Sequence, residues 1–168
     1  GSAVHAASLE RPVRLMIALE MIGYYDSAPG SQDYPYPAMS WLYPDRGDFI
    51  AVVGRMQDIN AVRQVKAALL SSRDLSVYSM NAPGFIPGID FSDHLNYWQH
   101  DIPAVMITDT AFYRNKQYHL PGDTADRLNY QKMAQMELQP CYTTVNNKNF
   151  SRRIQKKQHA HFIFFRLF

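Results

Sequence analysis

Apolar residues come in short runs, separated by polar stretches that are rich in glycine and proline. The run Val13–Gly23 is almost continuously apolar, which is typical of a strand buried on both faces. A short helix is predicted over Ala3–Leu9, because Pro12 would end it before this run begins. Residues 24–46 are rich in tyrosine, proline, glycine, serine and aspartate. They predict a long ordered loop, a kind of segment that often carries function.

The next segments alternate between strand and helix patterns. Asp48–Val53 has the apolar character of a second strand, and Leu75–Met80 has that of a third. Between them, Asp58 can cap a helix whose apolar residues recur on one face. These residues are Ile59, Val62, Val65 and Leu69. The order strand, helix, strand predicts an α/β fold with a mostly parallel sheet flanked by helices.

The remaining elements are a short helix, one more strand and a longer helix. After a loop rich in proline and glycine, Ser92 or Asp93 can cap a helix that runs to about Gln99. Ile102–Thr108 predicts the fourth strand, and Thr124–Met136 predicts a helix. We therefore expect a partial α/β domain over residues 1–139.

The C-terminal residues 140–168 differ from the rest in charge and pattern. Residues 1–145 hold 11 Lys/Arg and 15 Asp/Glu, whereas residues 146–168 hold 6 Lys/Arg and no acid. The periodic pattern ends at Asn146, and the apolar run His161–Phe165 has no expected partner. These residues predict a divergent basic tail that is either solvated or makes an electrostatic or membrane-surface contact. Because the body is acidic, nucleic acid is not an expected partner.

Membrane insertion and disulfide bonding are not expected. The longest apolar runs are far shorter than the roughly 20 residues of a membrane-spanning helix, so we expect no transmembrane segment and no signal peptide. Cys141 is the single cysteine, which excludes an intrachain disulfide. The cellular compartment stays open.

Several acid and imidazole groups occur where α/β proteins build their sites, at strand ends and helix starts. They are Glu20, Asp93, His94, Asp109, His119 and Asp123. Histidine with carboxylates is a ligand set that suits zinc. On spacing alone, each group could equally be a helix cap or a buried, hydrogen-bonded side chain.

Three segments, together and in this order, resemble the co-catalytic zinc aminopeptidases, a family related to bacterial leucyl aminopeptidases, glutaminyl cyclases and glutamate carboxypeptidases. The segments are Ile17-Ala18-Leu19-Glu20-Met21-Ile22-Gly23-Tyr24, Ser92-Asp93-His94 and Tyr118-His119-Leu120-Pro121-Gly122-Asp123-Thr124. The intervening segment 101–115 is also similar to bacterial members. The resemblance covers residues 1 to about 136. It implies the zinc-exopeptidase fold, of the phosphorylase/hydrolase-like type, incomplete on its N-terminal side.

The resemblance also implies residue roles. Glu20 corresponds to the carboxylate that binds one of two zinc ions, and His119 to the imidazole that binds the other. Tyr118 corresponds to a tyrosine whose hydroxyl steadies the developing oxyanion, or it is a packed aromatic residue. Asp123 would be a carboxylate behind the metal ligands or a helix-start residue. Asp93, His94 and Asp109 would form the wall of the site or lie behind the ligands.

Family members need further residues, which the resemblance places upstream of Glu20: a His-x-Asp motif, a bridging aspartate and a Glu-Glu pair. Only 19 residues precede Glu20, and they contain none of these motifs. We therefore expect a fragment or truncated aminopeptidase that is inactive alone and holds zinc poorly. A second hypothesis is a non-catalytic peptide- or protein-binding module that uses the loop Tyr24–Asp45. A third is that a second copy or a partner chain supplies the missing half, so that the chain forms an oligomer.

Overall fold

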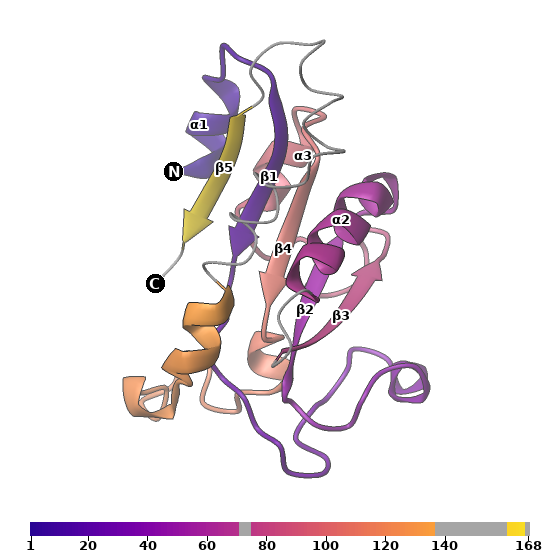
Figure 1. Ribbon diagram of the computed structural model, residues 1–168, viewed down its shortest axis with the longest axis vertical. Helices are drawn as coiled ribbons and strands as arrows, with labels where there is room; N and C mark the ends of the chain where they lie inside the picture. Colours follow the sequence, from indigo (N-terminus) through magenta and orange to yellow (C-terminus); the bar gives the residue numbers. More distant parts are fainter. Residues whose placement is uncertain (71–74, 137–160, 167–168) are drawn as a thin grey trace.

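The chain folds around one five-stranded sheet with the strand order β3-β2-β4-β1-β5 (Figure 1). The computed structural model describes residues 1–70, 75–136 and the backbone of 161–166. The strands are β1 (Val13–Leu19), β2 (Phe49–Gly54), β3 (Ser76–Asn81), β4 (Ala104–Thr108) and β5 (His161–Arg166). All residues of β2 and β4 are buried, as are the last five of β1, so the almost wholly apolar runs form the centre of the sheet.

The sheet consists of two parallel blocks that meet at one antiparallel pair. β4 and β5 both pair parallel to β1, β3 pairs parallel to β2, and β2 pairs antiparallel to β4. The expected mostly parallel sheet is therefore confirmed, with one reversal that the strand–helix–strand rhythm did not predict. The reversal lies between β2 and β4, and β4 in turn lies between β2 and β1. Because β1 and β4 are parallel, Glu20 and Asp109, which follow these strands, lie at the same end of the sheet.

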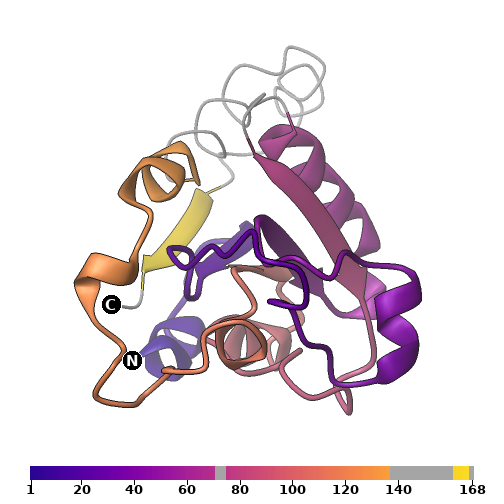
Figure 2. The same cartoon turned by 90° about the horizontal axis from the view of Figure 1, so that it is seen from below.

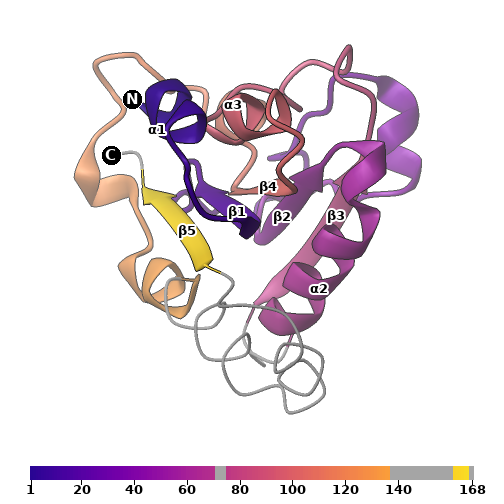
Figure 3. The ribbon, with the colours of Figure 1, turned by 90° about the horizontal axis from the view of Figure 1, so that it is seen from above.

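One face of the sheet is closed by α2 (Ile59–Leu69), which packs Val62, Val65 and Leu69 against it. The other face is covered in two parts. Over β1 and β4 lie α1 (Ser2–Ala7) and α3 (His94–Trp98), on the side opposite α2 (Figure 3). Over β2 and β3 this face is covered mainly by loops, and Trp98 at the end of α3 packs against the apolar cluster there.

Most expected elements are confirmed, but the helix predicted over Thr124–Met136 is broken. A 3-10 turn forms at Ala125–Arg127, Leu128 is extended at φ −86° and ψ 139°, and a helix then runs over residues 130–136. Asn129 starts that helix: its side-chain oxygen accepts a hydrogen bond from the Lys132 N–H at 3.0 Å, which is the geometry of an N-cap. Figure 2 shows this segment beside β5.

Two aspartates that were predicted to cap helices form other hydrogen bonds instead. Asp58 and Asp93 stand directly before α2 and α3, yet neither side chain bonds to the helix backbone. Asp58 instead accepts a hydrogen bond from Arg55 at 2.9 Å, and Asp93 accepts one from Ser2. Asp93 therefore ties α3 to α1, which requires the tertiary fold, whereas Asp58 pairs with a residue three positions earlier in the chain.

The C-terminal run His161–Phe165 was expected to have no partner, and this expectation is wrong. It forms most of β5, which pairs with β1 from Val13 to Leu19. A pattern rich in aromatic and β-branched residues suits an edge strand. The basic stretch before it and the boundary at residue 139 lie outside the described residues, so the division into domain and tail stays a prediction. In the part of the chain that is described, no helix has the length and apolar character to cross a membrane.

Candidate functional site

Glu20 is held at the carboxyl end of β1. Its backbone N–H donates to the Ile107 carbonyl at 3.0 Å, which continues the pairing between β1 and β4. The half-buried carboxylate accepts a hydrogen bond from the Ser92 hydroxyl at 2.9 Å. Burial raises the pKa of the Glu20 carboxyl, while the Ser92 hydrogen bond and the nearby His119 partly oppose that rise. The next residue, Met21, has a left-handed backbone with φ 50°, so the chain turns sharply after the carboxylate.

His119 approaches from a different segment, the loop that follows β4. It also has a left-handed backbone, with φ 58°, and its exposed imidazole stacks on the Tyr118 ring with centroids 3.9 Å apart. Burial raises the pKa of the Tyr118 phenol, with the nearby Glu20 adding to the rise. Asp123 closes this loop by accepting a hydrogen bond from the Asn115 side chain at 2.7 Å. The structure thus brings Glu20, Tyr118 and His119 to one end of the sheet.

Asp109 lies fully buried beneath this end of the sheet. Its carboxylate accepts hydrogen bonds from the N–H groups of Gly23 at 3.0 Å, Tyr24 at 2.7 Å and Ala111 at 2.9 Å. Burial nevertheless raises its pKa to about 6, because three neutral donors do not fully replace water. Asp109 therefore fixes the chain just after Glu20, and it does so from behind the site.

Asp93 and His94 lie farther along this region of the fold. Asp93 bonds to Ser2 of α1, although its charge still raises the pKa of Glu20. His94 is fully buried: its Nε2 lies 2.6 Å from the Ile89 carbonyl oxygen, and its ring packs edge-on against Trp98. Burial lowers the pKa of His94. Neither residue lines the pocket described below, and their predicted place in the wall of the site stays a prediction.

The donor set matches zinc in type but falls short in number. Carboxylate and imidazole are zinc ligands, and three protein ligands are usual in a catalytic site. Among the described residues, no three His, Cys, Asp or Glu side chains gather closely enough to hold a metal ion. Glu20 and His119 are therefore two candidate donors, not a complete site.

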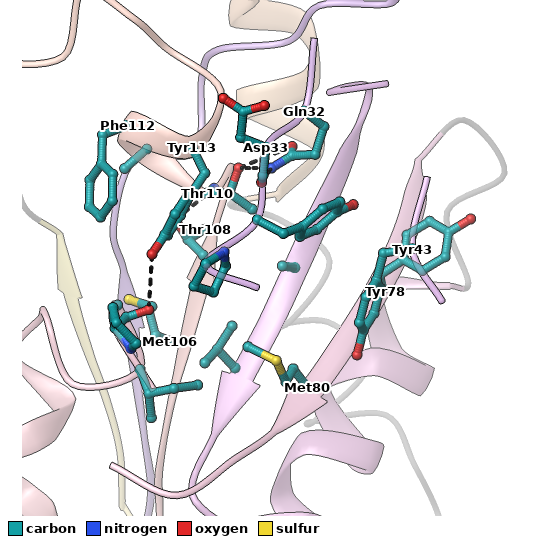
Figure 4. Close-up of a pocket in the computed structure, with 18 of the residues that line it drawn as sticks. Gln32, Asp33, Tyr43, Tyr78, Met80, Met106, Thr108, Thr110, Phe112 and Tyr113 are labelled. Carbon is teal, nitrogen blue, oxygen red and sulfur yellow. Dashed lines mark hydrogen bonds between the residues drawn. The ribbon is translucent and has the colours of Figure 1, made fainter. Parts of the chain in front are cut away.

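An apolar pocket of about 100 Å³, which Glu20 and Tyr118 help to line, opens over β2 and β3 on the face opposite α2. Figure 4 shows Tyr78, Met80, Met106 and Thr108 of its floor. Side chains of three strands form its floor: Phe49, Ala51 and Val53 of β2, Tyr78 and Met80 of β3, and Met106 and Thr108 of β4. The loops on either side supply the walls, including Gln32, Tyr34, Met39, Tyr43, Ile89, Phe91, Thr110, Phe112 and Tyr113.

Several polar groups in the walls are satisfied by hydrogen bonds within the protein. Thr110 and Gln32 exchange hydrogen bonds at 2.9 and 3.1 Å. The Tyr34 hydroxyl donates to the Pro44 carbonyl at 2.6 Å, and the Tyr43 hydroxyl donates to Ser79 at 3.0 Å. The pocket therefore offers mainly apolar surface, which suits a hydrocarbon or aromatic group.

Sequence reasoning missed several residues that shape this pocket. Arg114 is 3% exposed and fastens the long loop, since its Nε donates to Gln32 and its Nη1 to the Tyr24 and Phe49 carbonyls. Gly47 leaves room for it, because a Cβ there would lie 2.5 Å from the Arg114 side chain. The position of an arginine six residues after a buried strand could have pointed to this role, but its hydrogen-bond partners could not be predicted from the sequence.

A family model and a known protein match this chain in sequence. The family model described as peptidase family M28 matches residues 1–144. The uncharacterized protein YfbL of Escherichia coli (strain K12) is 95% identical over 136 residues, which are 81% of this chain and 42% of that protein.

Two solved structures share the fold at low sequence identity. The LapA aminopeptidase of Legionella pneumophila superposes with a TM-score of 0.58 at 20% identity, over 83% of this chain and 34% of that one. The zinc aminopeptidase BSAP of Bacillus subtilis gives 0.55 at 13% identity, over 86% and 32%. This chain spans less than half the length of each relative. The family match over most of the chain, supported by this likeness in fold, shows that the chain belongs to peptidase family M28.

Proposed function

We propose that this chain contributes one part of a zinc-dependent aminopeptidase-type site that acts on peptide N-termini. The observation that carries the proposal is the position of Glu20 and Tyr118 in the lining of one apolar pocket, with His119 stacked on Tyr118. Glu20 and His119 are the candidate metal donors. The Tyr118 hydroxyl is the candidate donor to the negative charge that develops on a peptide carbonyl during attack.

The pocket supports a preference for an apolar N-terminal residue. Its volume of about 100 Å³ and its internally bonded polar groups favour a leucine-, methionine- or phenylalanine-like side chain. An acidic side chain would lose its hydration and would find only the carboxylates of Glu20 and Asp33 among the charged groups that line the pocket, which costs several kcal/mol.

We do not expect these residues alone to hydrolyse peptides. Two donors fall short of the three that a catalytic zinc usually has, and the described residues contain no cluster of three such side chains. The further groups would come from outside the described residues, either from more of the same protein or from a partner chain.

Metal content and peptide turnover test this proposal directly. The chain, His119→Ala and the control His100→Ala, which changes an exposed histidine outside the site, would be loaded with zinc and assayed on a panel of aminoacyl p-nitroanilides. We expect substoichiometric zinc that is lost only in His119→Ala, and no turnover. Two tightly bound zinc ions with turnover would show that the site is complete. Zinc binding that His119→Ala leaves unchanged would remove His119 from it.

A second candidate is a peptide-binding module without turnover, which the formed apolar pocket favours. Ala51→Met would fill the pocket floor, whereas Ala67→Met adds the same side chain on the exposed side of α2. We expect Ala51→Met to weaken binding of a leucyl peptide at least about tenfold, and Ala67→Met to leave it unchanged. Equal binding by both variants would exclude the pocket as the peptide site.

A further inference from the structure

The loop that carries Tyr118 and His119 is closed by a buried amide. Asn115 is 1% exposed, and its side chain makes three hydrogen bonds. It donates to Asp123 at 2.7 Å and accepts from the Gln117 N–H at 3.0 Å and from Arg127 at 2.8 Å. Since Asn115 and Asp123 flank the loop, their hydrogen bond fixes its two ends together.

Arg127 connects this closed loop to the segment that follows Glu20. Its Nη1 donates to Asn115 and to the Gly122 carbonyl, and its Nη2 donates to the Tyr24 hydroxyl at 3.0 Å. The guanidinium also lies 4.7 Å from the centroid of the Tyr24 ring. The Tyr24 N–H is in turn held by buried Asp109. One side chain thus spans the two segments on which the candidate donors stand.

The contacts of Arg127 are unusual for an arginine near carboxylates. Within the described residues it forms no ion pair, and its donors go to an amide oxygen, a carbonyl and a phenol. Charge neutralisation therefore does not explain it. The shape of the guanidinium group explains these contacts, because it is rigid and planar and donates to acceptors in two directions. A lysine ammonium cannot reproduce that geometry.

The backbone of His119 needs such support. A non-glycine residue in the left-handed region costs on the order of 1–2 kcal/mol and persists only where its surroundings hold it. The direct support is weak, because the His119 N–H lies 3.4 Å from Asp123 Oδ2. The stronger hydrogen bonds are those of Asn115 and Arg127 at the ends of the loop.

We propose that Asn115 and Arg127 are positioning residues that set the place of the His119 imidazole relative to Glu20. This inference rests on the proposed function, in which Glu20 and His119 face the same metal site. Asn115 holds the two ends of the His119 loop together, and Arg127 sets the distance between that loop and the segment that follows β1. Outer partners of this kind commonly change metal affinity 10- to 100-fold.

The test compares Arg127→Lys and Asn115→Ala with the control Arg55→Lys. Arg55 is also half-buried and bonded to side-chain and carbonyl oxygens, but it lies by α2 and α3, away from the loop. NMR of the 13C-labelled His119 ring and of its backbone would follow the stacking on Tyr118 and the left-handed φ without any metal. Zinc titration of the same samples, with thermal unfolding alongside, would give the affinity.

We expect Arg127→Lys and Asn115→Ala to shift the His119 signals and to weaken zinc binding at least about tenfold, while Arg55→Lys does neither at a similar loss of Tm. Unchanged His119 signals in both loop variants would overturn the inference, as would an equal response in Arg55→Lys. If the unmodified chain binds no zinc but the loop variants shift His119, the metal proposal fails and the positioning role stands.

Discussion

The two faces of the sheet are covered by different kinds of side chains. On the face covered by α2, leucine, isoleucine and valine side chains pack into a continuous core with almost no polar group. On the opposite face, over β2 and β3, the strands carry a smaller cluster with aromatic and methionine side chains, an open pocket and loops fastened by Gln32, Asp109 and Arg114. The first face holds the fold together by burial, whereas the second depends on hydrogen bonds, which leave room for a ligand.

Neighbouring residues of β4 give the largest expected contrast between the faces. Ile107 is fully buried on the α2 face, so Ile107→Ala would leave a cavity and lower the free energy of unfolding by about 2–5 kcal/mol. Met106 borders the existing pocket, and Met106→Ala would enlarge a space that is already present. We expect a smaller loss, below about 2 kcal/mol. Urea unfolding of both variants measures the difference, and equal losses would contradict the contrast.

The hydrogen-bonded face should also depend on pH. Because burial raises the pKa of Asp109 from 3.8 to about 6, its charged form is disfavoured in the folded chain. Its contribution to stability is full below pH 4 and is lost as the pH rises through about 6, by roughly 3 kcal/mol at most. The Asp109→Asn variant should lack this change. Buried His94, whose pKa is lowered, acts in the opposite direction in both proteins, so the difference between their pH profiles isolates Asp109.

A glycine substitution tests how closely the α2 face is packed. A Cβ on Gly54 would lie 2.7 Å from Val62 of α2, so Gly54→Ala should cost about 1–3 kcal/mol through overpacking. Gly84, in the loop on the other side, has no atom within 4 Å of such a Cβ. Gly84→Ala should change the free energy of unfolding by less than about 1 kcal/mol, and in the stabilising direction. Thermal unfolding of both variants measures the effect.

The smallest effect is expected at the rim of the pocket. Lys116 and Asp33 form an ion pair with both side chains more than half exposed. Lys116→Ala should change the free energy of unfolding by less than about 1 kcal/mol, and raised salt should remove the difference. A larger loss that persists at high salt would mean that this pair, and not the buried Arg114, fastens the long loop.

The elements on the α2 face were predictable from the sequence, whereas those around the pocket were predictable only in part. Val62, Val65 and Leu69 recur at helical spacing, and the apolar runs of β1, β2 and β4 correspond to buried strands. Glu20 was identified because it follows such a run. The pocket was not, because Gln32, Thr110 and Arg114 are far apart in the sequence and meet only through long-range hydrogen bonds.

Two differences between the predicted and the observed elements, the broken helix before Met136 and the pairing of β5, depend on interactions that the local sequence does not show. Asn129 caps the helix that follows it, but the prediction of one helix over Thr124–Met136 did not take this residue into account. The partner of the C-terminal strand could not be read from His161–Arg166 alone, since pairing depends on which sheet edge is free.

The position of β4 has a consequence for how the chain acquires its structure. It is the last of the four core strands to be synthesised, yet it separates β1 from the β2–β3 pair. Until residue 108 has left the ribosome, the nascent chain holds the single strand β1 and the β2–β3 pair with no strand between them. Their unpaired apolar edges can bind other chains during that interval, so chaperone demand should peak just before β4 inserts.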